Sequence, residues 1–127
     1  MSSAYENLPV YKKALDLTVY FENIVRHFDR YHKYTVGSEL RDLSRRILFL
    51  IARANIKAGR KEMLVIALEK LEELKILIHV CREIKAFNNP KSFEVVCRSV
   101  LDITKQCEGW LRSQNLSPAT AGGGARR

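Results

Sequence analysis

The sequence contains few residues that interrupt helices. Proline occurs three times in 127 residues, as Pro9, Pro90 and Pro118, and proline inside a helix removes a hydrogen bond and clashes with the preceding turn. Long stretches are therefore free to be helical. Strict alternation of apolar and polar residues, the mark of a half-buried strand, is also absent. The sequence predicts an all-α protein.

Long apolar runs are missing as well. The longest, from Ile47 to Ala52, is far shorter than the roughly 18 residues that a membrane-spanning helix needs. The segment from Met1 to Lys13 contains no apolar core of a secretory signal. We therefore expect no membrane partner and a cytoplasmic location.

Cysteine is scarce, and its spacing fits no known framework. Cys81, Cys97 and Cys107 are an odd number, and no two form a Cys-x-x-Cys pair. This pattern is typical neither of a set of disulfides nor of a zinc site. Each cysteine lies in an apolar helical context, so we expect buried free thiols in a reducing compartment.

Patterns that carry catalysis or bind metal are absent from the sequence. None of His27, His32 and His79 follows a glutamate by three residues, as the Glu-x-x-His motif of metal sites in helical bundles requires. No serine lies in a Gly-x-Ser-x-Gly setting. The glycine cluster at 122–124 precedes no helix and so forms no phosphate-binding loop. We expect no catalytic residue, no metal and no cofactor.

Four segments show helical periodicity, and the first two cover residues 9–31 and residues 36 or 38 to 58. Pro9 suits a first turn, where the missing N–H costs nothing. Ser38 is expected to cap the second helix and Gly59 to follow its end. Their apolar stripes are Ala14, Leu17, Phe21, Ile24, Val25 and Phe28, and then Leu40, Leu43, Ile47, Leu50 and Ala54.

The third and fourth helical segments cover residues 61–87 and 92–112. The sequence Asn88-Asn89-Pro90 is expected to stop the third helix, because proline disfavours helix in the residue before it. Ser92 is the predicted N-cap of the fourth. Their stripes are Leu64, Ala67, Leu71, Leu74, Ile78 and Cys81, and then Phe93, Val96, Val100, Ile103, Cys107 and Trp110.

The connections between these helices are short, near residue 60 and over residues 88–91. Short connections make consecutive helices antiparallel neighbours. We therefore expect an antiparallel up-down-up-down four-helix bundle over residues 9–113. Residues 1–8 would form an N-terminal extension, and residues 114–127 have the composition of a flexible tail.

Apolar residues beside the main stripes exceed what one bundle core needs. Two explanations stay open at this point: a generous core, or a surface for self-association or a partner protein. The residues concerned are Leu48, Phe49 and Ile51 on the second helix, and Leu68, Ile76, Leu77, Val80 and Ile84 on the third.

The chain is strongly basic, with 22 Lys and Arg against 14 Asp and Glu and a net charge of +8. Such an excess favours polyanions through long-range attraction and counterion release, although a charge without function is also common. Helical spacing arranges much of it in stripes, and guanidinium groups bind phosphate well. The predicted nucleic-acid-binding residues are Arg41, Arg45, Arg46, Arg53, Lys57, Arg60, Lys75, Arg82 and Lys85.

Aromatic and basic residues alternate after the first helix, where Tyr31, His32 and Tyr34 lie among Arg30 and Lys33. Aromatic rings beside basic groups can stack on unpaired bases. The reading slightly favoured for the tyrosines is structural, with both rings closing the end of the bundle.

The order of four sequence blocks resembles a known family. The blocks are Tyr11-Lys-Lys-Ala-Leu, His27-Phe-Asp-Arg-Tyr-His-Lys-Tyr-Thr-Val-Gly-Ser-Glu-Leu-Arg41, Ala67-Leu-Glu-Lys-Leu-Glu-Glu-Leu-Lys75 and Gly109-Trp-Leu111. Together they are similar to the accessory variability determinant (Avd) proteins of diversity-generating retroelements. The superfamily also includes proteins encoded in 23S ribosomal RNA intervening sequences.

The resemblance implies a non-enzymatic subunit that binds a reverse transcriptase and nucleic acid. Such proteins form a positively charged homopentameric barrel and support mutagenic retrohoming, in which error-prone copying diversifies a target gene. The surplus apolar residues would then form the subunit interface. Two other functions stay open: an rRNA-associated bundle without a polymerase partner, and a structural or scaffolding bundle whose charge is incidental.

Overall fold

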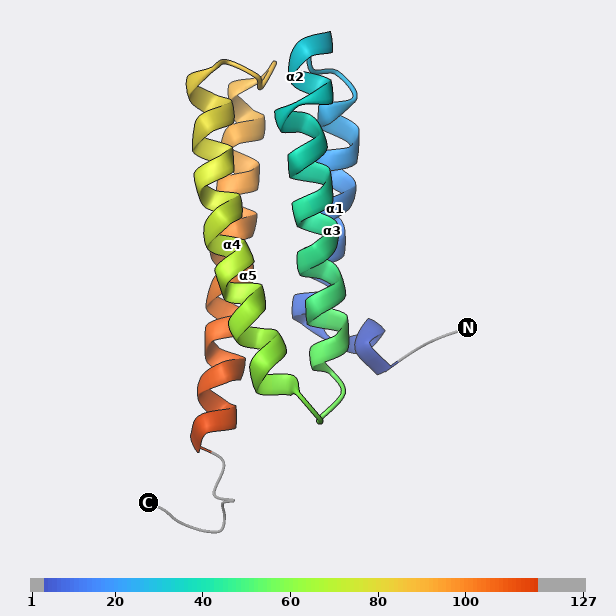
Figure 1. The fold of residues 1–127 in the computed structure, drawn as a ribbon, viewed down its shortest axis with the longest axis vertical. Coiled ribbons are helices and arrows are strands. Elements are labelled where there is room, and N and C mark those ends of the chain that lie inside the picture. The colour runs from blue at the N-terminus through green and yellow to red at the C-terminus, as the bar shows by residue number, and fades with distance from the viewer. Residues whose placement is uncertain (1–3, 117–127) are drawn as a thin grey trace.

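Four long helices dominate the computed structural model, which describes residues 4–116. They are α1 (Pro9–Val25), α3 (Val36–Ala54), α4 (Arg60–Glu83) and α5 (Pro90–Leu116), with the 3-10 turn η1 (Ala4–Asn7) before α1 and the short helix α2 (Arg30–Tyr34) before α3. No strand occurs in these residues. Figure 1 shows the long helices side by side, with α3 and α4 joined at one end and the other connections at the opposite end. The predicted all-α architecture of four helices is confirmed.

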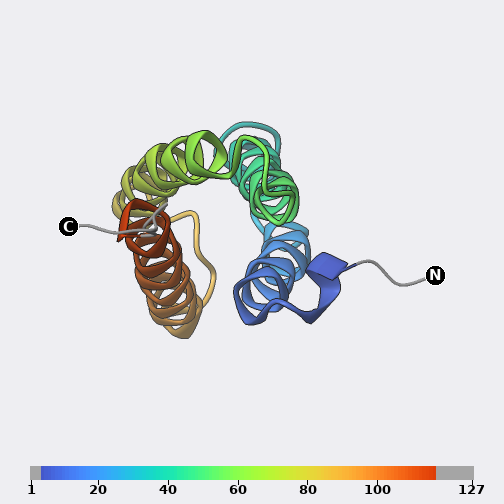
Figure 2. The same cartoon turned by 90° about the horizontal axis from the view of Figure 1, so that it is seen from below.

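The long helices follow one another along a curve when they are seen end-on, with α1 and α5 at its two ends (Figure 2). These two helices also contact each other. Tyr20 Oη on α1 donates to Ser92 Oγ on α5 at 3.3 Å, and Lys13 Nζ lies 2.8 Å from Asp102 Oδ2. The hydrogen bond from Lys13 lowers the pKa of Asp102. The first and last helices therefore enclose the core from the remaining side.

The predicted apolar stripes form most of the core, except that Ile51 rather than the predicted Leu50 is buried in α3. All six stripe residues of the third predicted helix are buried in α4, and Phe21 and Leu40 have no exposed surface. Each large side chain buried in this way contributes about 1.5–3 kcal/mol to folding. Burial of one face per helix is what spacings of three and four residues produce.

The first predicted helix is divided, which corrects its expected end at residue 31. Helix α1 ends at Val25, and the N–H groups of His27 and Phe28 each donate to the carbonyl three residues earlier, at 3.0 Å. Asp29 then caps α2, because its side chain accepts from the N–H of His32 at 3.0 Å. The apolar pattern continues to Phe28, so it does not indicate where the helix breaks. The break depends on a side chain that binds a backbone N–H, which periodicity does not record.

Gly37 lets the start of α3 approach the end of α1. A Cβ at position 37 would lie 2.6 Å from Cγ1 of Val25 and 3.0 Å from the carbonyl oxygen of His32. Only glycine leaves room for this contact. Ser38 is not the N-cap that was predicted: Thr35 precedes α3, and Ser38 Oγ donates to the carbonyl of Lys33 at 3.4 Å.

Helix α3 ends at Ala54 rather than at residue 58, because Arg60 binds its last carbonyls. Arg60 Nε donates to the oxygen of Ala54 at 2.7 Å and Nη2 to that of Asn55 at 2.9 Å. Carbonyls at a helix end have no helical partner of their own. Gly59 has a φ of 77°, which glycine adopts without a steric penalty, but it precedes α4 instead of directly following α3.

Helix α4 ends at Glu83, four residues before its predicted end at 87. Lys85 adopts a φ of 61°, and the N–H of Ala86 donates to the carbonyl of Cys81 at 2.8 Å. This is the Schellman arrangement, in which glycine usually occupies the position of Lys85. A side chain at such a φ costs roughly 1–2 kcal/mol.

Helix α5 begins at Pro90, which corrects the predicted N-cap at Ser92. The side chain of Asn89 accepts from the N–H of Lys91 at 2.9 Å, so Asn89 caps the helix and Pro90 occupies its first turn. Ser92 lies inside this turn and is buried. The proline that was expected only to stop one helix also starts the next.

The predicted domain limits differ slightly from the structure at the C-terminal side. Helix α5 continues to Leu116, past the predicted end of the bundle at 113, because no proline or glycine occurs over residues 110–116. The rest of the predicted tail, residues 117–127, and residues 1–3 of the extension lie outside the described residues. No helix within residues 4–116 has both the length and the apolar character that crossing a membrane requires.

The surplus apolar residues are divided between core and surface. Leu48 and Ile51 are buried, whereas Phe49 is 64% exposed. On α4, Leu68 and Leu77 pack against the core, whereas Ile76 is 60% exposed. Val80 and Ile84 are exposed like Ile76. The core therefore accounts for only part of the surplus apolar residues.

Candidate nucleic-acid interface

Two of the predicted basic residues, Arg41 and Arg45, are paired with an acidic residue of the neighbouring helix. Arg41 Nε on α3 lies 3.2 Å from Glu22 Oε1 on α1, and Arg45 Nη2 contacts Glu22 Oε2. Arg45 also lies 3.9 Å from Asp42. These pairs connect α1 with α3 and offset much of the charge that a phosphate would otherwise meet.

Arg60 is occupied by structural contacts. Besides its hydrogen bonds to the two α3 carbonyls, its guanidinium carbon lies 5.4 Å from the ring centroid of Trp110 on α5. One side chain thus connects α3, α4 and α5. The guanidinium of Arg60 would have to give up these contacts before it could bind a phosphate. Arg60 is therefore a poor nucleic-acid ligand.

Arg46 and Arg53 on α3, and Lys57 in the connection that follows it, are the basic residues of this region that stay available. All three are exposed, and none forms an ion pair within residues 4–116. The spacing of seven residues places Arg46 and Arg53 along one side of the helix. They form the first basic group of this surface.

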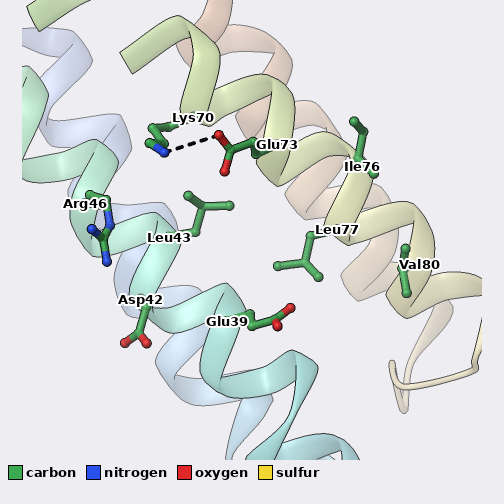
Figure 3. Close-up of a pocket in the computed structure, with 9 residues that line it drawn as sticks. All are labelled: Glu39, Asp42, Leu43, Arg46, Lys70, Glu73, Ile76, Leu77 and Val80. Atoms are coloured by element: carbon green, nitrogen blue, oxygen red, sulfur yellow. Dashed lines mark hydrogen bonds and ion pairs between the residues drawn. The ribbon is translucent and has the colours of Figure 1, made fainter. Parts of the chain in front are cut away.

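Arg46 also borders a groove between α3 and α4, shown in Figure 3. The groove encloses about 460 Å³, and Lys70 Nζ lies 3.2 Å from Glu73 Oε2 at its edge. Its charges are of both signs, so the groove itself is not a phosphate site. The lining residues are Glu39, Asp42, Leu43, Arg46, Lys70, Glu73, Ile76, Leu77 and Val80.

Lys75 and Arg82 of α4 lie on the side that faces α5, and Lys85 follows the end of the helix. Lys75 borders a hollow with His79 and Leu101, and its Nζ lies 3.4 Å from Glu72 Oε1. The guanidinium carbon of Arg82 lies 4.9 Å from the ring centroid of Phe93 on α5. Arg82 and Lys85 are exposed and form the second basic group.

The two basic groups do not form one continuous patch. Arg46 of the first group borders the α3–α4 groove and Arg82 of the second group packs on Phe93 of α5, so helix α4 lies between these two arginines. The exposed residues between them include Glu69, Glu72 and Glu73, which repel a polyanion. The predicted stripe on the second helix is shorter than expected, because Lys57 follows the end of α3 and Arg60 begins α4.

The two tyrosines of α2 do not close the end of the bundle, which contradicts the favoured structural reading. Tyr31 is 72% exposed and Tyr34 is 68% exposed, and α2 contains no buried residue. The end is closed below α2 by Phe28 and Phe87, whose ring centroids are 5.9 Å apart.

The α4–α5 connection lies at the same end of the molecule as α2 (Figure 1). Asn88 donates to the carbonyl of His27, which fixes the connection beside the end of α1. Lys91 follows in the first turn of α5 and is exposed. Sequence reasoning missed Lys91 because the placement of the α4–α5 connection and α2 at one end depends on how the helices pack.

The thiols and histidines form no site. The three cysteines are free, as predicted; Cys81 and Cys107 are buried, and Cys97 is half-buried. Burial raises the pKa of Cys81 and of Cys107 to about 12, so both are protonated and unreactive near neutral pH. Nowhere in residues 4–116 do three His, Cys, Asp or Glu side chains group as a metal site would need.

Comparison with known proteins leaves these observations as the basis for assigning a function, since no protein-family model and no curated protein matches the sequence.

Proposed function

We propose that this chain is a non-enzymatic, nucleic-acid-binding accessory subunit of a retroelement reverse transcriptase, acting in the cytoplasm and supporting mutagenic retrohoming. In this proposal the helices form an antiparallel up-down-up-down bundle, and five bundles assemble into a homopentameric barrel. The polymerase partner and the barrel rest on the resemblance of the sequence to Avd proteins. The nucleic-acid binding also rests on the surface of the molecule.

The observation that carries the proposal is the set of basic residues without acidic partners. Arg46, Arg53, Lys57, Arg82 and Lys85 are exposed, and within residues 4–116 none of them forms an ion pair. With a net charge of +8, each phosphate contact releases condensed counterions and gains affinity. Assembly would multiply these contacts and add avidity.

The first experiment measures binding of RNA and DNA by the full chain over a range of salt concentrations. The variant R46Q/R53Q/K57Q should reduce the dependence of log K on log salt by about 0.7–0.9 for each phosphate contact that is lost. R41Q/R45Q is the control of similar chemistry, because both arginines already pair with Glu22. We expect a smaller change in slope for this control.

A second experiment tests the partner. The tagged chain should retain the reverse transcriptase encoded beside its gene in a pull-down at moderate salt. Binding to nucleic acid without retention of the polymerase would refute the accessory role and favour the rRNA-associated bundle. No binding to RNA or DNA at low salt would instead favour a scaffolding bundle.

A further inference from the structure

The end of the molecule that contains α2 combines exposed aromatic rings with concentrated positive charge. Residues 26–35 and 82–91 include six Lys and Arg and two acidic residues. One of the acidic residues, Asp29, is engaged as the cap of α2 and lies 3.0 Å from His32 Nδ1. The basic residues are Arg26, Arg30, Lys33, Arg82, Lys85 and Lys91.

Tyr31 and Tyr34 contribute little to the fold. Their side chains leave most of their surface in water, although tyrosine is usually at least half-buried in globular proteins. A spacing of three residues places both rings on neighbouring positions of the same helical turn. Arg30 and Lys33 share that spacing, and Arg30 precedes Tyr34 by four residues, so this arginine and this ring lie on the same face of the helix.

Helix α2, which contains both tyrosines, is held in place by hydrogen bonds and close packing despite its exposure. Thr35 Oγ1 donates to the carbonyl of Tyr31 at 2.8 Å, and Ser38 Oγ donates to that of Lys33 at 3.4 Å. Gly37 brings the start of α3 against Val25 and the carbonyl of His32. A rigid support lowers the entropy that binding would otherwise cost.

We propose that this end binds single-stranded nucleic acid, with unpaired bases stacked on Tyr31 and Tyr34 and phosphates held by Arg30, Lys33 and Lys85. The inference rests on the proposed nucleic-acid-binding function and assigns it a site. Unpaired bases expose the ring faces that tyrosines contact, whereas the bases of a duplex are already stacked on each other. The positive charge favours a nucleic-acid strand over an acidic protein segment, because a strand carries a phosphate at every nucleotide.

The test compares anisotropy titrations of the full chain with oligothymidylate, oligouridylate and a blunt DNA duplex of equal length. Y31A/Y34A should weaken binding to both single strands by roughly 30-fold or more, and duplex binding by much less. Y31F/Y34F keeps the rings and should bind nearly as the wild type does. The deoxy and ribo strands show whether the sugar matters.

Charge is tested separately. R30Q/K33Q should reduce the salt slope for single strands by about 1.4, since each phosphate contact contributes about 0.7. The control K12Q/K61Q removes the same charge from exposed positions in the first turns of α1 and α4, and should change the slope less. Both helices begin at the end of the molecule opposite to α2 (Figure 1). Thermal unfolding and light scattering must first show that all variants keep the wild-type fold and mass.

The outcomes separate the two proposals. If the wild type binds no nucleic acid at low salt, the proposed function fails and this site fails with it. If the wild type binds, but Y31A/Y34A binds single strands as tightly, only the site is refuted. Equal losses for single strands and duplex would also refute stacking, because they would indicate a general effect on the surface or on assembly.

Discussion

Cys81 and Cys107 hold thiols where ionisation is strongly disfavoured. Neither side chain has exposed surface, and burial raises the pKa of each to about 12. Glu39 adds to the increase at Cys81, and Glu108 adds to it at Cys107. In the unfolded chain both thiols titrate near the ordinary value of about 8.5. At a pH between about 8.5 and about 12, the two thiols of the folded state keep protons that the unfolded state releases.

We therefore expect the free energy of unfolding to fall as the pH rises above about 8.5. The loss is up to about 1.4 kcal/mol per pH unit for each thiol, and it continues until the folded thiols ionise. Urea unfolding at a series of alkaline pH values measures the slope. C81A removes one titrating group and should make the slope shallower by that amount, whatever its packing cost. Equal slopes in variant and wild type would contradict this account.

The availability of each basic residue for phosphate could not be read from the sequence. Periodicity correctly placed Arg41 and Arg46 on one helix, but it does not tell which residue meets an acidic side chain from another helix. Glu22 on α1 pairs with Arg41, and the two are distant in sequence. The contact between Phe28 and Phe87 has the same origin, because these two rings come from segments that are distant in sequence.

At the scale of elements, the helices were predictable and their ends were not. The spacing of apolar residues follows the buried face of a helix, so the four long helices and most of their buried residues could be predicted from the sequence. The ends depend on single groups that bind the backbone: Asp29 caps α2, Arg60 binds the carbonyls that end α3, and Lys85 turns the chain after α4. None of these residues alters the apolar pattern.

The prediction at the scale of elements concerns Arg60, which binds carbonyls at the end of α3. R60K keeps the charge but loses the planar fork that reaches Ala54 and Asn55 and the contact with Trp110. Charge-assisted hydrogen bonds and a cation–π contact are together worth about 2–3 kcal/mol, so the free energy of unfolding in urea should fall by that amount. R53K changes an exposed residue and should stay within about 0.5 kcal/mol of the wild type. Weaker nucleic-acid binding by R60K at unchanged stability would instead place Arg60 on a phosphate.

At the scale of the whole molecule, exposed apolar residues are most numerous on α4, and α3 adds Phe49. Phe49 on α3 is 64% exposed and Ile76 on α4 is 60% exposed. A ring of five identical copies needs a head-to-tail contact, in which each copy uses two different surfaces. In the proposed barrel, Phe49 would supply one side of such a contact and Ile76 the other.

The proposed ring predicts a mass five times the 14.6 kDa of the chain in light scattering. F49A and I76A should each break it, because each damages one side of every junction. Mixing the two variants should restore one sound junction, between Phe49 of the I76A copy and Ile76 of the F49A copy. The mixture should therefore form dimers and no ring. V19A and L101A, which change exposed apolar residues of α1 and α5, should keep the full mass. A monomeric wild type would refute the ring.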